Sequence, residues 1–164
     1  MKHLPLSLVL LVACSVFLVQ KATAQILAEK QALTLEAAKI VAAAAEAEAM
    51  SNDWAVVIAI VDAGGHLLYL QRMDGVQLAS LEVARQKAVT AALYRRPSKA
   101  FADRITDGNN ATLSLPNVIA IEGGLPIIVN EHVIGAIGVS GVPAHFDAQI
   151  GRAGISALLA QIGQ

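Results

Sequence analysis

The sequence contains a single cysteine, Cys14, and it lies in the first segment of the chain. That segment opens with Met1-Lys2-His3, continues as an almost wholly apolar run over residues 4–19, and reaches the small-x-small triplet Ala22-Thr23-Ala24. This order is typical of a secretory signal peptide. Cleavage after Ala24 removes the only cysteine, so the mature protein would have no disulfide, no thiol nucleophile and no cysteine-bound metal.

Two other interpretations fit this segment less well. A transmembrane anchor needs roughly 20 apolar residues, and the run over residues 4–19 is shorter. A lipoprotein processing site would lipidate Cys14, but residues 15–19 after it are apolar rather than a polar tether. We therefore predict a signal peptide at residues 1–24 and a single domain at residues 25–164. The mature protein is expected to be periplasmic or secreted, without a membrane association.

Charged residues are also scarce, at 15% of the chain against roughly 25% in ordinary soluble domains. Removing residues 1–24 takes away Lys2 and Lys21 from the 12 Lys and Arg and none of the 13 Asp and Glu, which leaves a net charge of −3. This balance gives no reason to expect nucleic acid as a partner. A small domain has much surface to cover with few charges, so we expect apolar surface to be buried in a homo-oligomer.

The first half of the mature chain alternates helical and extended patterns. Residues 35–50 carry small and apolar residues at helical spacing after Thr34, a suitable N-cap. Residues 54–62 form a continuous β-branched run, which is typical of a central strand. Ala63-Gly64-Gly65-His66 then predicts a turn, and residues 67–71 a returning strand.

The second half predicts a helix over residues 78–94, ended by Pro97, and a polar loop over 103–117. Three short strands follow at 118–121, 126–130 and 133–140, and a last helix at 145–161. Helix, two strands, helix, three strands and helix is the order of an α+β fold with an antiparallel sheet.

Several stretches resemble one family in order: "VDAGGHLLYLQRMDG", "ARQKAVTAALYRRP", "EGGLPIIV" and "GAIGVSG", followed by Asp147 and Gly154. The sequence resembles the haem-binding HbpS/GlcG family, whose fold also forms the C-terminal domain of PduO-type cobalamin adenosyltransferases. The resemblance runs over residues 34–159. It implies a profilin-like α/β/α sandwich with a five-stranded antiparallel sheet in the order 2-1-5-4-3, assembly into oligomers, and haem as a ligand. After Asp147 the chain lacks the further acidic residues that are usual in the family. Of the family's acidic side chains at this position, only that of Asp147 is therefore expected to have a role here.

The implied strand order places distant residues at the same end of the sheet, because neighbouring strands run in opposite directions. The turns that hold His66 and His132 share one end, here called the His66 end. The other end is here called the Arg72 end. It holds the end of the returning hairpin strand, the Gly123-Gly124 turn, the end of the strand at 133–140 and the start of the last helix. Its candidate ligand-binding residues are Arg72, Asp74, Gly123, Gly124, Pro126 and Ser140.

The other candidates are Lys87, Tyr94 and His145, and several of the candidates have a purely structural alternative. Lys87 and Tyr94 share a face of the second helix; Lys87 is either a solvated lysine or an inward cation for a haem propionate. His145 is either a surface residue or the ligand of a haem iron, since it is the histidine near the Arg72 end. Arg72 and Asp74 could equally pair with each other or cap a helix.

Two function classes remain open from these residues. In the first, the protein is an exported haem-binding module for haem sensing, storage or handling. In the second, it is a small enzyme or enzyme accessory acting on a carboxylate or other metabolite, with Arg72 and Lys87 holding the anion and His145 or Asp74 moving a proton. The sequence offers no clear nucleophile and no acid/base pair at fixed spacing, which favours binding.

Overall fold

The central strand β1 (Val57–Asp62) forms from the β-branched run, and its residues are buried on both faces up to Val61.

The computed structural model describes residues 30–164. The predicted signal peptide, Cys14 and the expected mature start at Gln25 lie outside the described residues. Residues Gln31–Gln164 form one unit. No helix in the described part of the chain has the length and apolarity needed to cross a bilayer.

The sheet has four antiparallel strands within residues 30–164, in the order β2-β1-β4-β3. The hairpin partner of β1 is β2 (Leu67–Arg72), and β3 (Gly124–Val129) pairs with β4 (His132–Ser140). Strand β4 pairs with β1 and so joins the two hairpins. The order of these four strands agrees with the order that the family resemblance implied.

The fifth strand expected at residues 118–121 does not form. The Oγ1 of Thr90 accepts a hydrogen bond from the Ile119 N–H at 2.9 Å and donates one to the Asn117 carbonyl at 2.9 Å. The Oγ of Ser98 donates to the Ile121 carbonyl at 2.6 Å. Hydroxyl groups from neighbouring segments therefore satisfy the backbone that would otherwise have paired with the edge of β3.

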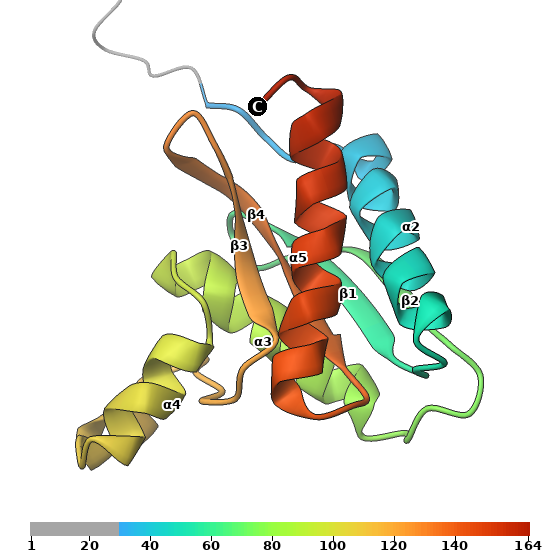
Figure 1. Ribbon diagram of the computed structural model, residues 1–164. Coiled ribbons are helices and arrows are strands. Elements are labelled where there is room, and N and C mark those ends of the chain that lie inside the picture. The colour runs from blue at the N-terminus through green and yellow to red at the C-terminus, as the bar shows by residue number, and fades with distance from the viewer. Residues whose placement is uncertain (1–29) are drawn as a thin grey trace, which may run out of the picture. The chain divides into compact units, whose positions relative to one another are not determined.

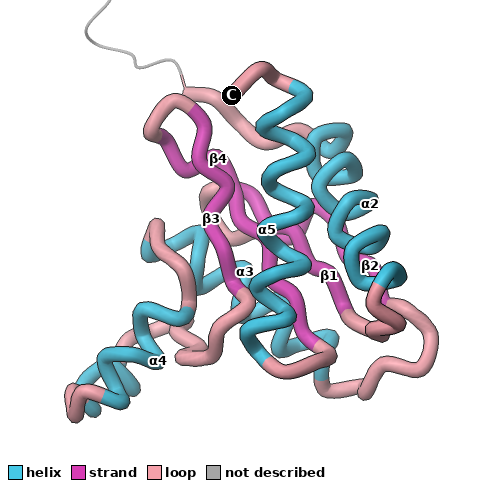
Figure 2. The backbone as a smooth tube through the Cα atoms, in the orientation of Figure 1, coloured by secondary structure: helices cyan, strands magenta, loops and turns pink. Residues whose placement is uncertain are grey.

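Helices cover both faces of the sheet (Figures 1 and 2). Helices α2 (Leu35–Ser51) and α5 (Ala144–Gln161) lie side by side on one face, and α3 (Ser80–Tyr94) packs on the other against β1, β3 and β4. The larger core fills the space between the sheet and the α2/α5 pair, and two smaller apolar clusters lie under α3. The predicted α+β class with layers on both faces is confirmed.

The predicted boundaries of α2, α3 and α5 agree with the structure to within about two residues, and Thr34 caps α2 by accepting from the Ala37 N–H at 3.1 Å. The predicted loop over residues 103–117 is wrong in part. Helix α4 (Lys99–Thr106) runs into it, and the 3-10 helix η1 (Asn110–Ser114) follows. Phe101 anchors α4 by burying its ring, whose edge meets the ring of Tyr94 at a centroid distance of 5.1 Å.

Candidate functional site

The strand register brings some of the candidate residues of the Arg72 end close together. Val57 pairs with Arg72 on one side and with Ser140 on the other, and Gly124 pairs with Gly138. Cross-strand partners point to the same face, so Arg72 and Ser140 share the face of Val57, which packs under α3. His145 lies on α5, which covers the opposite face. The structure therefore divides the predicted site between the two faces of the sheet.

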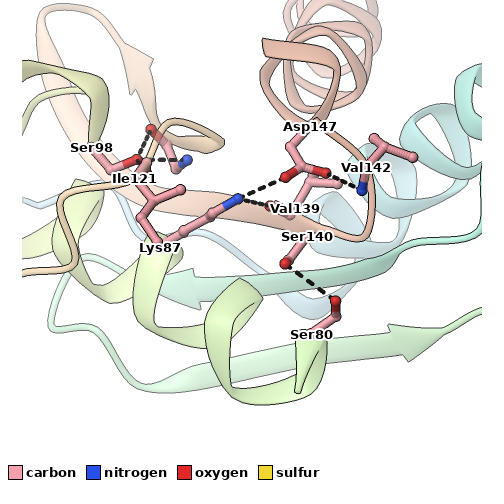
Figure 3. Close-up of polar contacts among 9 residues, drawn as sticks. Ser80, Lys87, Ser98, Ile121, Val139, Ser140, Val142 and Asp147 are labelled. Atoms are coloured by element: carbon pink, nitrogen blue, oxygen red, sulfur yellow. Dashed lines mark hydrogen bonds and ion pairs between the residues drawn. The ribbon is translucent and has the colours of Figure 1, made fainter. Parts of the chain in front are cut away.

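Lys87 and Asp147 form a buried ion pair at this end (Figure 3). The Nζ of Lys87 donates to the Asp147 Oδ2 at 2.7 Å and to the Val139 carbonyl at 2.9 Å, and the lysine is 1% exposed. The Asp147 Oδ1 accepts from the Val142 N–H at 3.2 Å. Lys87 thus points inward, and the carboxylate that it meets belongs to the protein itself.

Asp147 lies in an environment that disfavours its charged form. Burial raises the pKa of the Asp147 carboxyl above its ordinary value, and the hydrogen bond from Lys87 opposes this effect only in part. The ion pair links α3 to α5, two helices from opposite faces of the sheet. A buried pair of this kind is costly to break from one side, because the remaining charge loses its partner.

The glycines of the turn before β3 make room for this ion pair. Gly123 has φ +121, and a Cβ built there would lie 2.8 Å from the Lys87 Nζ and 2.9 Å from the Asp147 Cβ. A Cβ at Gly124 would lie 2.1 Å from the Lys87 carbonyl oxygen. Both glycines are therefore explained by the approach of α3 and α5. The Gly124 N–H also donates to the Ser98 Oγ at 2.9 Å, a contact that sequence reasoning missed.

The remaining buried or half-buried candidates also have partners within the chain. The Oγ of Ser140 donates to the Ser80 Oγ at 3.3 Å. The Tyr94 hydroxyl donates to the Pro116 carbonyl at 2.7 Å. Pro126 is half-buried in β3, opposite Ala136. The two hydrogen bonds connect α3 to β4 and to the loop at Pro116.

Arg72 and Asp74 are both exposed, at the end of β2 and just after it. No ion pair joins them within residues 30–164, and the N-cap of α3 is Ala79 without a side-chain hydrogen bond. Neither structural alternative that the sequence offered for them is therefore observed. Their charges face solvent.

His145 is exposed in the first turn of α5. Its ring lies 3.9 Å from that of Phe146, centroid to centroid, and the Phe146 ring lies 4.6 Å from that of Trp54. These three rings form an aromatic cluster on the α2/α5 side of the sheet. The cluster offers a flat apolar contact, and no carboxylate is bonded to the imidazole within the described residues.

At the opposite end of the sheet, His66 is bonded to Asp62. The His66 Nδ1 lies 3.2 Å from the Asp62 Oδ2, and the imidazole is 83% exposed. The Asp62 Oδ1 accepts from the backbone N–H groups of Gly64 at 2.8 Å and His66 at 2.9 Å. Sequence reasoning missed this pair, although an Asp four residues before a His across a glycine turn is a visible signal.

No group of three or more His, Cys, Asp or Glu side chains gathers as a metal site in the part of the chain that the structure describes. A bare metal ion would need such a group, because proteins hold ions by several ligands at once. An iron that arrives in a porphyrin already has four ligands and needs only one or two more from the protein.

A four-stranded antiparallel sheet between a helix pair and a single helix, with an ion pair joining the two helical layers, defines an α+β sandwich protein. The chain belongs to the HbpS-like family, whose model, described as "Haem degrading protein HbpS-like", matches residues 33–156. The family predicted from the sequence is therefore confirmed.

Individual relatives agree with this assignment. Protein GlcG of Escherichia coli (strain K12) is 40% identical over 111 residues, which are 68% of this chain and 83% of GlcG. The crystal structure of Klebsiella pneumoniae protein ORFY superposes with a TM-score of 0.78 at 33% identity, over 82% of this chain and 95% of ORFY. The PduOC:Heme complex superposes with a TM-score of 0.73 at 28% identity, over 77% of this chain and 95% of that one.

Proposed function

We propose that this protein binds haem, and that it serves haem sensing, storage or handling outside the cytoplasm. The observation that carries the proposal is the similarity over most of the chain to a protein whose structure is described as a haem complex. The description of the family also names haem. Relatives with the same fold and more than a quarter of their residues in common support the same ligand class here.

The side chains present are compatible with haem held at a surface. Three histidines, His66, His132 and His145, are exposed within residues 30–164, and each could give one imidazole nitrogen to an iron. Arg72 is exposed and can meet a propionate, whereas the Nζ of Lys87 is buried and has two acceptors of its own. Haem bound here would bring its redox-active iron; the chain's own residues would ligate, orient and shield it.

This arrangement favours binding over the metabolite-enzyme alternative. That alternative needed Arg72 and Lys87 to hold one substrate anion together. Arg72 faces solvent, and Lys87 is 1% exposed and paired with Asp147, so the two cations do not share an open surface.

The mature chain, residues 25–164, should bind haem in solution. Titration with haemin is expected to give a saturable Soret band that differs from that of free haemin, at a fixed ratio of haem to protein chains. The same titration in denaturant is the control, because unfolded chain binds haemin without a defined geometry. An unchanged haemin spectrum up to high micromolar protein would refute the proposal.

Export and assembly belong to the same proposal. The signal-like segment motivates a mature N-terminus at Gln25, and the low charge content motivates a homo-oligomer. Mass spectrometry of the exported form should find Gln25 first, and light scattering should find an assembly larger than a dimer. A form that begins at a lipidated Cys14, or a monodisperse monomer, would contradict the corresponding expectation.

A further inference from the structure

The imidazole of His66 is held by the turn between β1 and β2. Asp62 is the last residue of β1, where it pairs with Gly135 of β4, and its carboxylate bonds both the turn backbone and the His66 ring. A Cβ on Gly64 would lie 2.9 Å from the His66 Cε1 and 3.0 Å from its Nδ1, so the imidazole lies close against this bare glycine. The ring is therefore oriented by a rigid strand end and not by a loose loop.

The Asp62 carboxylate also selects the tautomer of the ring. Its Oδ1 accepts from the backbone N–H groups of Gly64 and His66, and its Oδ2 lies 3.2 Å from the Nδ1 of the His66 ring. A carboxylate accepts a hydrogen bond from the Nδ1–H of the ring, so the Nδ1 keeps its proton and the lone pair lies on Nε2. Metal-ligating histidines are commonly oriented in this way by a carboxylate behind the ring.

Apolar surface lies next to this turn. The turn's second glycine, Gly65, sits on α3, since a Cβ there would lie 3.5 Å from side-chain atoms of both Leu93 and Val89. Leu93 is 41% exposed, and Leu67, the residue after His66, is 48% exposed. A bulge in β2 shifts the register between Ile60 and Val61, and this shift places Leu67 opposite Val61 on the α3 face.

Cations lie just after the C-terminal end of α3. Arg95 and Arg96 come directly after Tyr94 and are exposed, and neither takes part in an ion pair within residues 30–164. An arginine fork suits a propionate carboxylate. The Arg96 Nε donates to the Tyr94 carbonyl at 3.1 Å, which leaves its terminal NH2 groups for a ligand. An oriented imidazole, exposed leucines and arginines outside ion pairs can together contact the iron, the porphyrin and the propionates of a surface-bound haem.

We propose that the Nε2 of His66, oriented by Asp62, would bind the haem iron. This places the site at the end of the sheet opposite to the one that the sequence indicated. The assignment rests on the proposed function. A single imidazole without other metal ligands suits only a metal that brings its remaining ligands, as a metalloporphyrin does. His145 and His132 lack the carboxylate partner that His66 has within the described chain.

The test compares four forms of the mature protein in a haemin titration: the wild type, His66→Ala, His132→Ala and His145→Ala. His66→Ala should shift the Soret maximum and weaken binding at least tenfold, and added free imidazole should restore the wild-type maximum. His132→Ala and His145→Ala are the matched controls, since each removes an exposed imidazole; both should keep the wild-type spectrum. Circular dichroism checks that all four are folded.

A second measurement needs no haem. In the free protein, nitrogen chemical shifts of the His66 ring should show the proton on Nδ1. Asp62→Asn should lose this preference, and it should weaken haem binding by about ten- to a hundredfold.

The outcomes separate the two proposals. If His66→Ala keeps the wild-type Soret spectrum, or if His145→Ala alone loses it, the His66 assignment is wrong. Haem binding by the protein would still be supported. A proton on Nε2 in the free protein also overturns the assignment. No haemin response from any form, the wild type included, refutes the proposed function and this assignment with it.

Discussion

Replacing Lys87 by methionine is expected to lower the free energy of unfolding by about 3–5 kcal/mol, because Asp147 would be left as a buried charge without its cation. The lysine is 1% exposed, and its Nζ lies 2.7 Å from the Asp147 Oδ2. Methionine keeps the length of the side chain and removes only the ammonium group. At about 4 °C per kcal/mol for a domain of this size, the melting temperature should fall by roughly 12–20 °C.

The double variant Lys87→Met/Asp147→Leu separates the charge effect from a packing effect. Removing both charges leaves no unpaired ion, so much of the lost stability should return. Lys99→Met is the matched control, because Lys99 also pairs with an aspartate, Asp103, but at an exposed position. It should leave the urea midpoint nearly unchanged. A Lys87→Met variant as stable as the control would show that the buried pair contributes little to the fold.

Replacing Gly138 by alanine is expected to have a comparably large effect. A Cβ there would lie 2.1 Å from the Ala84 carbonyl oxygen and 2.5 Å from the Ala88 N, both backbone atoms of α3. Backbone cannot rotate away as a side chain can, so α3 would have to move off the sheet. The loss of stability should reach or exceed the upper end of the roughly 1–3 kcal/mol that overpacking usually costs. Urea unfolding of the purified variant measures it.

Gly151→Ala in α5 is the matched control for this substitution. The atom nearest to its Cβ would be the tip of the Leu125 side chain, at 3.1 Å, which can turn aside, and the Ile137 Cγ2 at 3.6 Å would be in ordinary contact. Alanine is also the better helix former by about 1 kcal/mol, so this variant should be as stable as the wild type or slightly more stable. If Gly138→Ala were equally well tolerated, the close approach of α3 to β4 would not be needed for folding.

The layered fold follows from local patterns that the sequence displays directly. The apolar run of β1, the glycine turn after it and the small residues at helical spacing in α2 and α3 each specify one element without help from the others. The edge strand expected at residues 118–121 failed, because a short apolar run becomes a strand only if a neighbour offers free backbone groups. Thr90 and Ser98 bond that segment instead.

The site depended much more on tertiary structure. The sequence placed Lys87 correctly among small residues but could not decide whether it faced water or the core, since helical spacing allows both. Asp147, 60 residues later, decides it by supplying the partner that lets a charge be buried. The sequence also placed Arg72 and Ser140 at one end of the sheet, but it did not show on which face of the sheet each side chain lies. The pairing of both residues with Val57 determines that face.

The sequence by itself determined the α+β class, the order of the four strands through the family it resembles, and the scarcity of charge that motivates an oligomer. Only the tertiary structure decided which ionisable groups are buried in pairs and which remain exposed. The reason is physical: backbone propensity and hydrophobic spacing act between near neighbours, whereas the burial of a charge depends on a partner that the fold brings from a distant segment. Lys87 and His66 each bond an aspartate, yet Lys87 is buried and His66 is 83% exposed, and only the tertiary structure shows this difference.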